Sequence, residues 1–123
     1  MIAYVTVGAD DMTLAETFYS AFLPALGYRL EHYQGDLSYI LPDGPDAPHF
    51  YIKSPFNGET ASAGNGAMVA LNVGSKEEVD ALHAKALSLG AADEGAPGNR
   101  TDTFYGGYFR DMDGNKLVVF TAV

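Results

Sequence analysis

Histidine is the residue type best suited to hold a metal in this cysteine-free chain, and it occurs three times, as His32, His49 and His83. A zinc site needs about four converging ligands. His83 follows Leu82 beside an apolar helical stripe, which predicts a packed or half-exposed histidine and not a ligand. The other two histidines lie near the ends of expected strands. Their spacing therefore predicts no shared metal site.

Tyrosine is the second candidate for chemistry, with 8 copies beside 7 phenylalanines. Strand alternation sends Tyr4 and Thr6 to one face of the first expected strand. Tyr4 or Tyr51 could act as an acid, and Arg100 or Arg110 could hold a carboxylate or oxyanion. Aromatic side chains also fill cores, so these rings either line a ligand site or fill space.

The segment 111–115 resembles the start of a calcium loop, with the sequence DMDGN. In an EF-hand loop the glycine is the sixth residue and a Glu closes the loop at position 12. Here Gly114 is fourth and a strand pattern follows. We interpret the segment as a β-turn.

Composition and charge narrow the class of protein. The chain has 123 residues, 47% of them hydrophobic, which suits one globular domain spanning 1–123. Its net charge of −9 argues against nucleic acid or an anionic membrane as partner. No apolar run is long enough for a membrane helix, and the first residues do not resemble a signal peptide, so we expect a soluble cytoplasmic protein.

The hydrophobic pattern predicts two similar halves. In the first, a strand at 2–8 precedes a helix whose stripe includes Leu14, Phe18, Phe22 and Leu26 and which Gly27 ends. Further strands are expected at 28–33, 37–41 and 49–53, with a turn at 42–48 and a loop at 54–66.

The second half repeats this order. A strand at 68–73 is followed by a helix that begins with the capping pattern Ser75 and Glu78 and ends at Gly90. A short strand at 91–93, a loop at 95–102 and a hairpin of 104–110 with 116–121 complete it. Residues 4–7 match 68–71 at an offset of 64, which indicates internal duplication.

This layout, with several short segments in order, resembles the glyoxalase/bleomycin-resistance/dioxygenase (vicinal oxygen chelate) family. The segments are 54–58 (SPFNG), 63–66 (AGNG), 79–84 (VDALHA), 93–98 (DEGAPG) and 110–116 (RDMDGNK). The resemblance implies an α+β fold of paired βαβββ modules, 1–56 and 65–123, with mixed curved sheets and helices outside. It also implies a homodimer.

Enzymes of this family usually hold a divalent metal, and the resemblance places its ligands on the first strand of each module, the last strand and the strand before the central loop. The matching residues here are Tyr4, Met68, Val118 and Tyr51. A phenol is a poor ligand at neutral pH, a thioether is soft and valine donates nothing. We therefore expect no metal and no other cofactor.

The leading functional hypothesis is a metal-free protein that binds a small aromatic or cationic organic molecule, as in the bleomycin-resistance branch. Strand alternation combined with the resemblance implies these lining residues: Tyr4, Thr6, Tyr51, Met68, Ala70, Arg100, Tyr105, Tyr108, Val118 and Phe120. One alternative is a metal-independent lyase, isomerase or other enzyme of the superfamily that uses Tyr and Arg for acid–base chemistry. Another is a structural or regulatory dimer with a filled cavity. Whether the protein is an enzyme stays open at this point.

Overall fold

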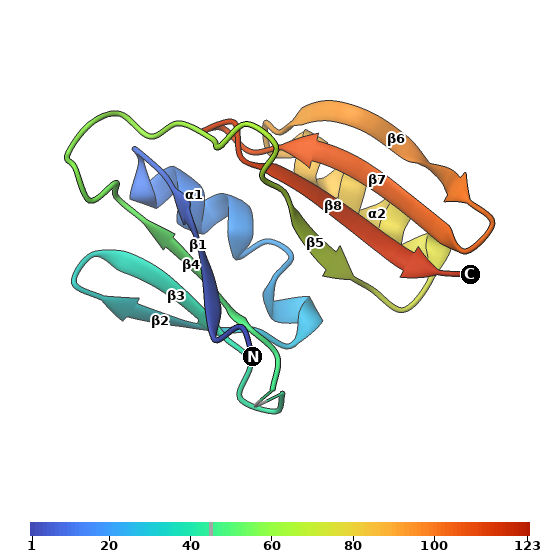
Figure 1. The fold of residues 1–123 in the computed structure, drawn as a ribbon, viewed down its shortest axis with the longest axis horizontal. Helices are drawn as coiled ribbons and strands as arrows, with labels where there is room; N and C mark the ends of the chain where they lie inside the picture. The colour runs from blue at the N-terminus through green and yellow to red at the C-terminus, as the bar shows by residue number, and fades with distance from the viewer. Residues whose placement is uncertain (45) are drawn as a thin grey trace. The chain divides into compact units, whose positions relative to one another are not determined.

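The two halves of the chain fold into the same order of elements. A computed structural model describes residues 1–44 and 46–123 as two compact units, Met1–Ser62 and Ala63–Val123 (Figure 1). The first contains β1 (Tyr4–Gly8), α1 (Met12–Tyr19), the 3-10 helix η1 (Pro24–Leu26), β2 (Arg29–Tyr33), β3 (Asp36–Ile40) and β4 (His49–Lys53). The second contains β5 (Val69–Asn72), α2 (Lys76–Ser88), β6 (Ala92–Thr101), β7 (Phe104–Arg110) and β8 (Lys116–Ala122). The predicted α+β fold with two βαβββ modules is confirmed.

Each unit contains one mixed four-stranded sheet with the same topology. The strand order is β1-β4-β3-β2 in the first unit and β5-β8-β7-β6 in the second. The first strand of each sheet pairs in parallel with the last strand of its own unit, and the other pairs are antiparallel. Within the described residues, no helix is long and apolar enough to cross a membrane.

Helix α1 covers one face of the first sheet. Asp11 caps the helix, accepting a 2.9 Å hydrogen bond from the Leu14 N–H. The Tyr19 ring packs 5.3 Å from the Phe50 ring, and the Ser20 hydroxyl lies 2.7 Å from that of Tyr39. Alternation along the strands therefore places the neighbours of Phe50 and Tyr39 on the opposite face.

Helix α2 covers one face of the second sheet and packs unusually close to β7. A Cβ added to Gly107 would lie 3.0 Å from the His83 ring, so the glycine permits this approach. His83 is only 4% exposed, and its Nε2 lies 3.1 Å from the Tyr108 carbonyl oxygen and 3.2 Å from an Asp93 carboxylate oxygen. Of the two environments expected for His83, packed and half-exposed, the structure shows the packed one.

The first helix is shorter than predicted, because it ends at Tyr19 and not near Gly27. Pro24 explains the difference. Proline lacks an N–H and clashes with the carbonyl four residues earlier, and it disfavours helical geometry in the residue before it. The chain continues the apolar stripe through turns and through η1, so Phe22 and Leu23 are still buried.

The predicted loop at 95–102 is wrong, because β6 runs through most of it. Gly95, Pro97 and Gly98 suggested a loop, but the pairing of β6 with β7 absorbs them through register shifts between Asp93 and Gly95 and between Gly95 and Gly98. Strand β6 lies at the edge of its sheet, where proline is tolerated. The predicted turn at 42–48 includes residue 45, which lies outside the described residues.

The turn between β7 and β8 is confirmed and is organised by Asp111. One carboxylate oxygen of this buried residue accepts from the N–H groups of Asp113 and Asn115, each at 2.9 Å. The other accepts from the Asn115 side-chain amide at 2.9 Å. Gly114 has a φ of 85°, a conformation that favours glycine. The carboxylate therefore serves the turn and is not an available metal ligand.

Replacing Asp111 with alanine should destabilise the protein by roughly 2–4 kcal/mol, because three donors in a buried turn lose their acceptor. Chemical unfolding would measure this. Asp102→Ala is the matched control, since Asp102 is exposed, and it should change stability by less than about 0.5 kcal/mol. Equal effects of the two substitutions would contradict the assigned role of Asp111.

Candidate binding site

The face of the first sheet opposite α1 carries a polar and aromatic set of side chains, which we call the helix-free face of the first unit. Strand register aligns Thr6, Tyr51, Ser38 and Glu31 in one row across the four strands. Tyr4 precedes this row on β1. The row joins side chains that are far apart in sequence because the last strand of the unit inserts beside the first.

Two tyrosines on this face stack against each other. The Tyr4 and Tyr51 rings have centroids 4.6 Å apart and an interplanar angle of 25°. The Tyr51 hydroxyl also lies 3.4 Å from His49 Nδ1. Tyr4 is 55% exposed, so the pair is not core filler in the manner of Tyr39, which is fully buried. A large aromatic surface is thus presented in a fixed orientation.

The stacked pair forms one wall of a hollow of about 370 Å³, which we call the tyrosine hollow. This volume is within the range of sites for small organic molecules. Tyr33, on the edge strand β2, is 63% exposed and adds a third aromatic ring. The complete lining is Tyr4, Glu31, His32, Tyr33, Asp36, Ser38, Ile40, Tyr51 and Lys53.

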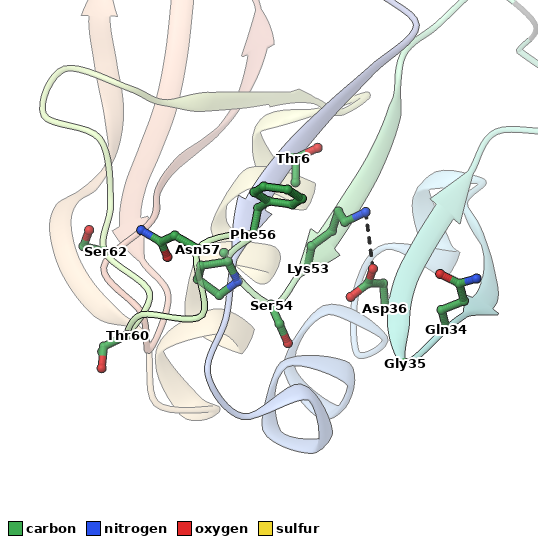
Figure 2. Close-up of a pocket in the computed structure, with 12 residues that line it drawn as sticks. Thr6, Gln34, Gly35, Asp36, Lys53, Ser54, Phe56, Asn57, Thr60 and Ser62 are labelled. Atoms are coloured by element: carbon green, nitrogen blue, oxygen red, sulfur yellow. Dashed lines mark ion pairs between the residues drawn. The ribbon is translucent and has the colours of Figure 1, made fainter.

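A second hollow, of about 630 Å³, adjoins the first and shares Asp36 and Lys53 with it. The Lys53 ammonium lies 3.3 Å from an Asp36 carboxylate oxygen (Figure 2). We call this space the loop hollow, because residues 54–62 form much of its lining. Its one aromatic ring belongs to Phe56, which is fully exposed, so the loop hollow offers small polar groups and backbone where the tyrosine hollow offers rings.

The helix-free face of the second unit has a different chemistry. Tyr108 on β7 is aligned with Val118 on β8, and Val118 with Ala70 on β5. The Arg100 guanidinium lies 5.2 Å from the centre of the Tyr108 ring, and the Lys116 ammonium lies 5.4 Å from it. This face therefore presents an aromatic ring flanked by two cations.

Tyr105, a predicted lining residue, lies on the other face of β7. Its hydroxyl donates a 2.7 Å hydrogen bond to Asp80 of α2, and Lys76 of the same helix lies 5.2 Å from its ring. Tyr105 and Tyr108 differ by three positions, and an odd separation places side chains on opposite faces of a regular strand. The structure therefore does not bring Tyr105 together with Tyr108.

The other predicted residues fall into two sets, one in each unit. Tyr4, Thr6 and Tyr51 share the helix-free face of the first unit. Met68 is 48% exposed just before β5, and Val118 is fully buried. Phe120 stacks on Phe104 with centroids 4.7 Å apart, a contact that the sequence did not suggest.

Several residues of the tyrosine hollow were missed by the sequence analysis. They come from the hairpin of β2 and β3 and from the end of β4, and they are Glu31, Tyr33, Asp36, Ser38 and Lys53. The signal for them was present, because the same alternation that selected Tyr4 and Thr6 applies along each of these strands. What was missing was the register that aligns the hairpin with Tyr51.

Known proteins resemble this chain in sequence and in fold. The family model described as Glyoxalase/Bleomycin resistance protein/Dioxygenase superfamily matches residues 1–119. The chain belongs to this superfamily. Among solved structures, a glyoxalase/bleomycin resistance protein from Albidiferax ferrireducens T118 is 35% identical, with a TM-score of 0.88 and 98% of each chain covered.

Solved structures with lower sequence identity share the fold. A glyoxalase-related enzyme from Fulvimarina pelagi is 18% identical with a TM-score of 0.79, and 98% of this chain and 87% of that chain are covered. The fosfomycin resistance protein FosX from Mesorhizobium loti is 13% identical with a TM-score of 0.73, over 100% and 92% of the two chains. No curated protein matches the chain.

The residues at the superfamily's metal positions do not fit a divalent ion. By the resemblance these are Tyr4, Tyr51, Met68 and Val118. The first two rings stack face to face, and the last side chain is fully buried hydrocarbon. Across residues 1–44 and 46–123, no group of three or more His, Cys, Asp or Glu side chains is placed to hold a metal. We therefore assign no chemistry to a metal here.

The contact of Tyr105 with Asp80 is testable through its effect on ionisation. The hydrogen bond to Asp80 raises the pKa of Tyr105 above its usual value, with smaller contributions from burial and from the charges of Asp80 and Glu77. Asp80→Ala should lower this pKa, and Glu77→Ala should lower it less. NMR titration of labelled tyrosine rings would measure both.

The sign of the effect on stability follows from linkage. A pKa raised in the folded state gives stabilisation that is complete below the unfolded value, near 10, and is lost as pH rises through the folded value. Asp80→Ala should therefore flatten the loss of stability at high pH. An unchanged Tyr105 pKa in this variant would contradict the contact.

Proposed function

We propose that this superfamily member binds a small planar organic molecule, preferentially a cation, in the tyrosine hollow and without a metal. The observation that carries the proposal is the partly exposed stack of Tyr4 on Tyr51 within a hollow of ligand size. A flat ligand can contact these rings and Tyr33 by stacking. Little conformational entropy of Tyr4 and Tyr51 is lost on binding, because the two rings already stack on each other.

The preference for positive charge rests on ring electrostatics and on the local charges. The face of a tyrosine ring attracts a cation lying within about 6 Å of its centre. Two carboxylates, Glu31 and Asp36, line the hollow against one ammonium, Lys53. Glu31 also pairs with Arg29, but both side chains of that pair are more than half exposed, so the pairing contributes little and can yield to a ligand.

The alternative, a metal-independent enzyme using Tyr and Arg, has weaker support. That alternative uses Tyr4 or Tyr51 as the acid and Arg100 or Arg110 to hold the oxyanion, but neither arginine lines the tyrosine hollow. Arg110 already donates hydrogen bonds to Glu94 and to the Gly114 carbonyl oxygen. The predicted homodimer and cytoplasmic location stay predictions.

A titration with benzyltrimethylammonium tests the proposal, because this probe combines a flat ring with a permanent positive charge. Calorimetry or NMR should show saturable binding. Tyr4→Ala and Tyr51→Ala should each weaken it by about 3- to 30-fold, the range of one desolvated cation–π contact. Neutral benzyl alcohol should bind more weakly than the cation.

Phe56→Ala is the matched control, since it removes an exposed ring from the loop hollow alone. It should leave the affinity within about twofold. The proposal fails if Phe56→Ala weakens binding as much as Tyr51→Ala does, or if benzyl alcohol binds as tightly as the cation.

A further inference from the structure

Two cations in the second unit converge on one ring from neighbouring strands. Arg100 of β6 and Lys116 of β8 flank Tyr108 of the central strand β7, at 5.2 Å and 5.4 Å from the ring centre. This chain has only seven Lys and Arg residues against 16 acidic ones. A pair of cations around one ring is therefore notable against a net charge of −9.

The local backbone holds the Arg100 side chain in place. Its Nη2 donates a 2.6 Å hydrogen bond to the Ala96 carbonyl oxygen. A Cβ added to Gly95 or to Gly98 would lie 3.1 Å from the guanidinium, so both glycines make room for it. Gly95 also has a φ of 154°, at a register shift of the edge strand. The irregular strand thus orients a group whose remaining N–H donors are available.

Neither cation has a carboxylate partner among the described residues. All five ion pairs found in residues 1–44 and 46–123 involve other side chains. The neighbouring Arg110 differs, because it donates to Glu94 and, at 2.8 Å, to the Gly114 carbonyl oxygen. Arg110 lowers the pKa of the Glu94 carboxyl group, chiefly through this hydrogen bond. The charge of Lys116 lowers the same pKa by a smaller amount, without an ion pair between Lys116 and Glu94.

We infer that Arg100 and Lys116 bind a small oxyanion group, a carboxylate or a phosphate, next to the Tyr108 ring. A guanidinium recognises such a group through two parallel N–H bonds, and an ammonium adds a second charge. The half-buried ring lies beside both cations and can contact the body of an organic acid. The proposed oxyanion site shares no residue with the tyrosine hollow and has the opposite charge preference.

NMR titrations of the ¹⁵N-labelled chain with benzoate and with inorganic phosphate, at constant ionic strength set by chloride, test the inference. Amide shifts should concentrate on β6, β7 and β8 and should saturate. Arg100→Gln and Lys116→Gln should each weaken binding by at least about tenfold, because a hydrogen bond to a charged group is lost. Arg100→Lys should retain part of the affinity.

Lys76→Gln is the matched control, since Lys76 lies 5.2 Å from the Tyr105 ring and is therefore a cation over a ring on the opposite face of β7. It removes the same charge and should leave affinity unchanged. Binding of benzoate alone or of phosphate alone would still support an oxyanion site and would identify its source. The inference is overturned if neither anion saturates, or if Lys76→Gln weakens binding as much as Lys116→Gln. Well-dispersed spectra of each variant show that it has folded.

Discussion

Each unit has one α-helix for a four-stranded sheet, and one helix can cover only one face. Because side chains alternate along a strand, each strand sends half of its side chains to the covered face and half to the opposite face. The covered faces hold Phe50 and Tyr39 in the first unit and Phe109 in the second, and all three side chains are buried. The opposite faces hold the groups that can meet a ligand. Both candidate sites follow from this constraint, because each lies on a helix-free face.

Strand topology then decides which groups meet. In both units the first strand pairs in parallel with the last, so residues near the start of the unit meet residues 45 positions later in the first unit and 48 positions later in the second. That pairing stacks Tyr4 on Tyr51 in the first unit. The equivalent pairing in the second unit aligns Ala70 with Val118, which are small or apolar. The groups of this face that can contact a ligand are therefore Tyr108 and the two cations beside it, Arg100 and Lys116. The same fold thus presents two unlike surfaces.

The fold could be predicted from the sequence because duplication, capping residues and hydrophobic period agreed with one another. The failures were local. Pro24 ended α1 early although the apolar stripe continued, and edge pairing kept Gly95, Pro97 and Gly98 within a strand. In both places the hydrophobic pattern and the positions of glycine and proline predicted different structures, and tertiary packing determined which one formed.

The candidate sites could be predicted only in part. Alternation along one strand placed Tyr4 and Thr6 on the same face. The resemblance to the superfamily indicated that this face lines a cavity, and it also pointed to Tyr51 and Val118. The partners across strands, such as Glu31 in line with Tyr51 or Lys116 beside Tyr108, depend on strand register, which turns and bulges set. Tyr105 shows the same limit, because its place on the helix face follows from the pairing of β7 and from Asp80 of α2.

The central claim is that the residues which the resemblance assigns to the family's metal positions, Tyr4, Tyr51, Met68 and Val118, do not hold a divalent metal. Elemental analysis of the purified chain, combined with thermal unfolding in the presence of EDTA, tests it most directly. The account predicts substoichiometric Zn, Ni, Mn and Fe, and a melting temperature that EDTA does not change. One equivalent of a divalent metal, removed by EDTA with a fall in melting temperature, would contradict it.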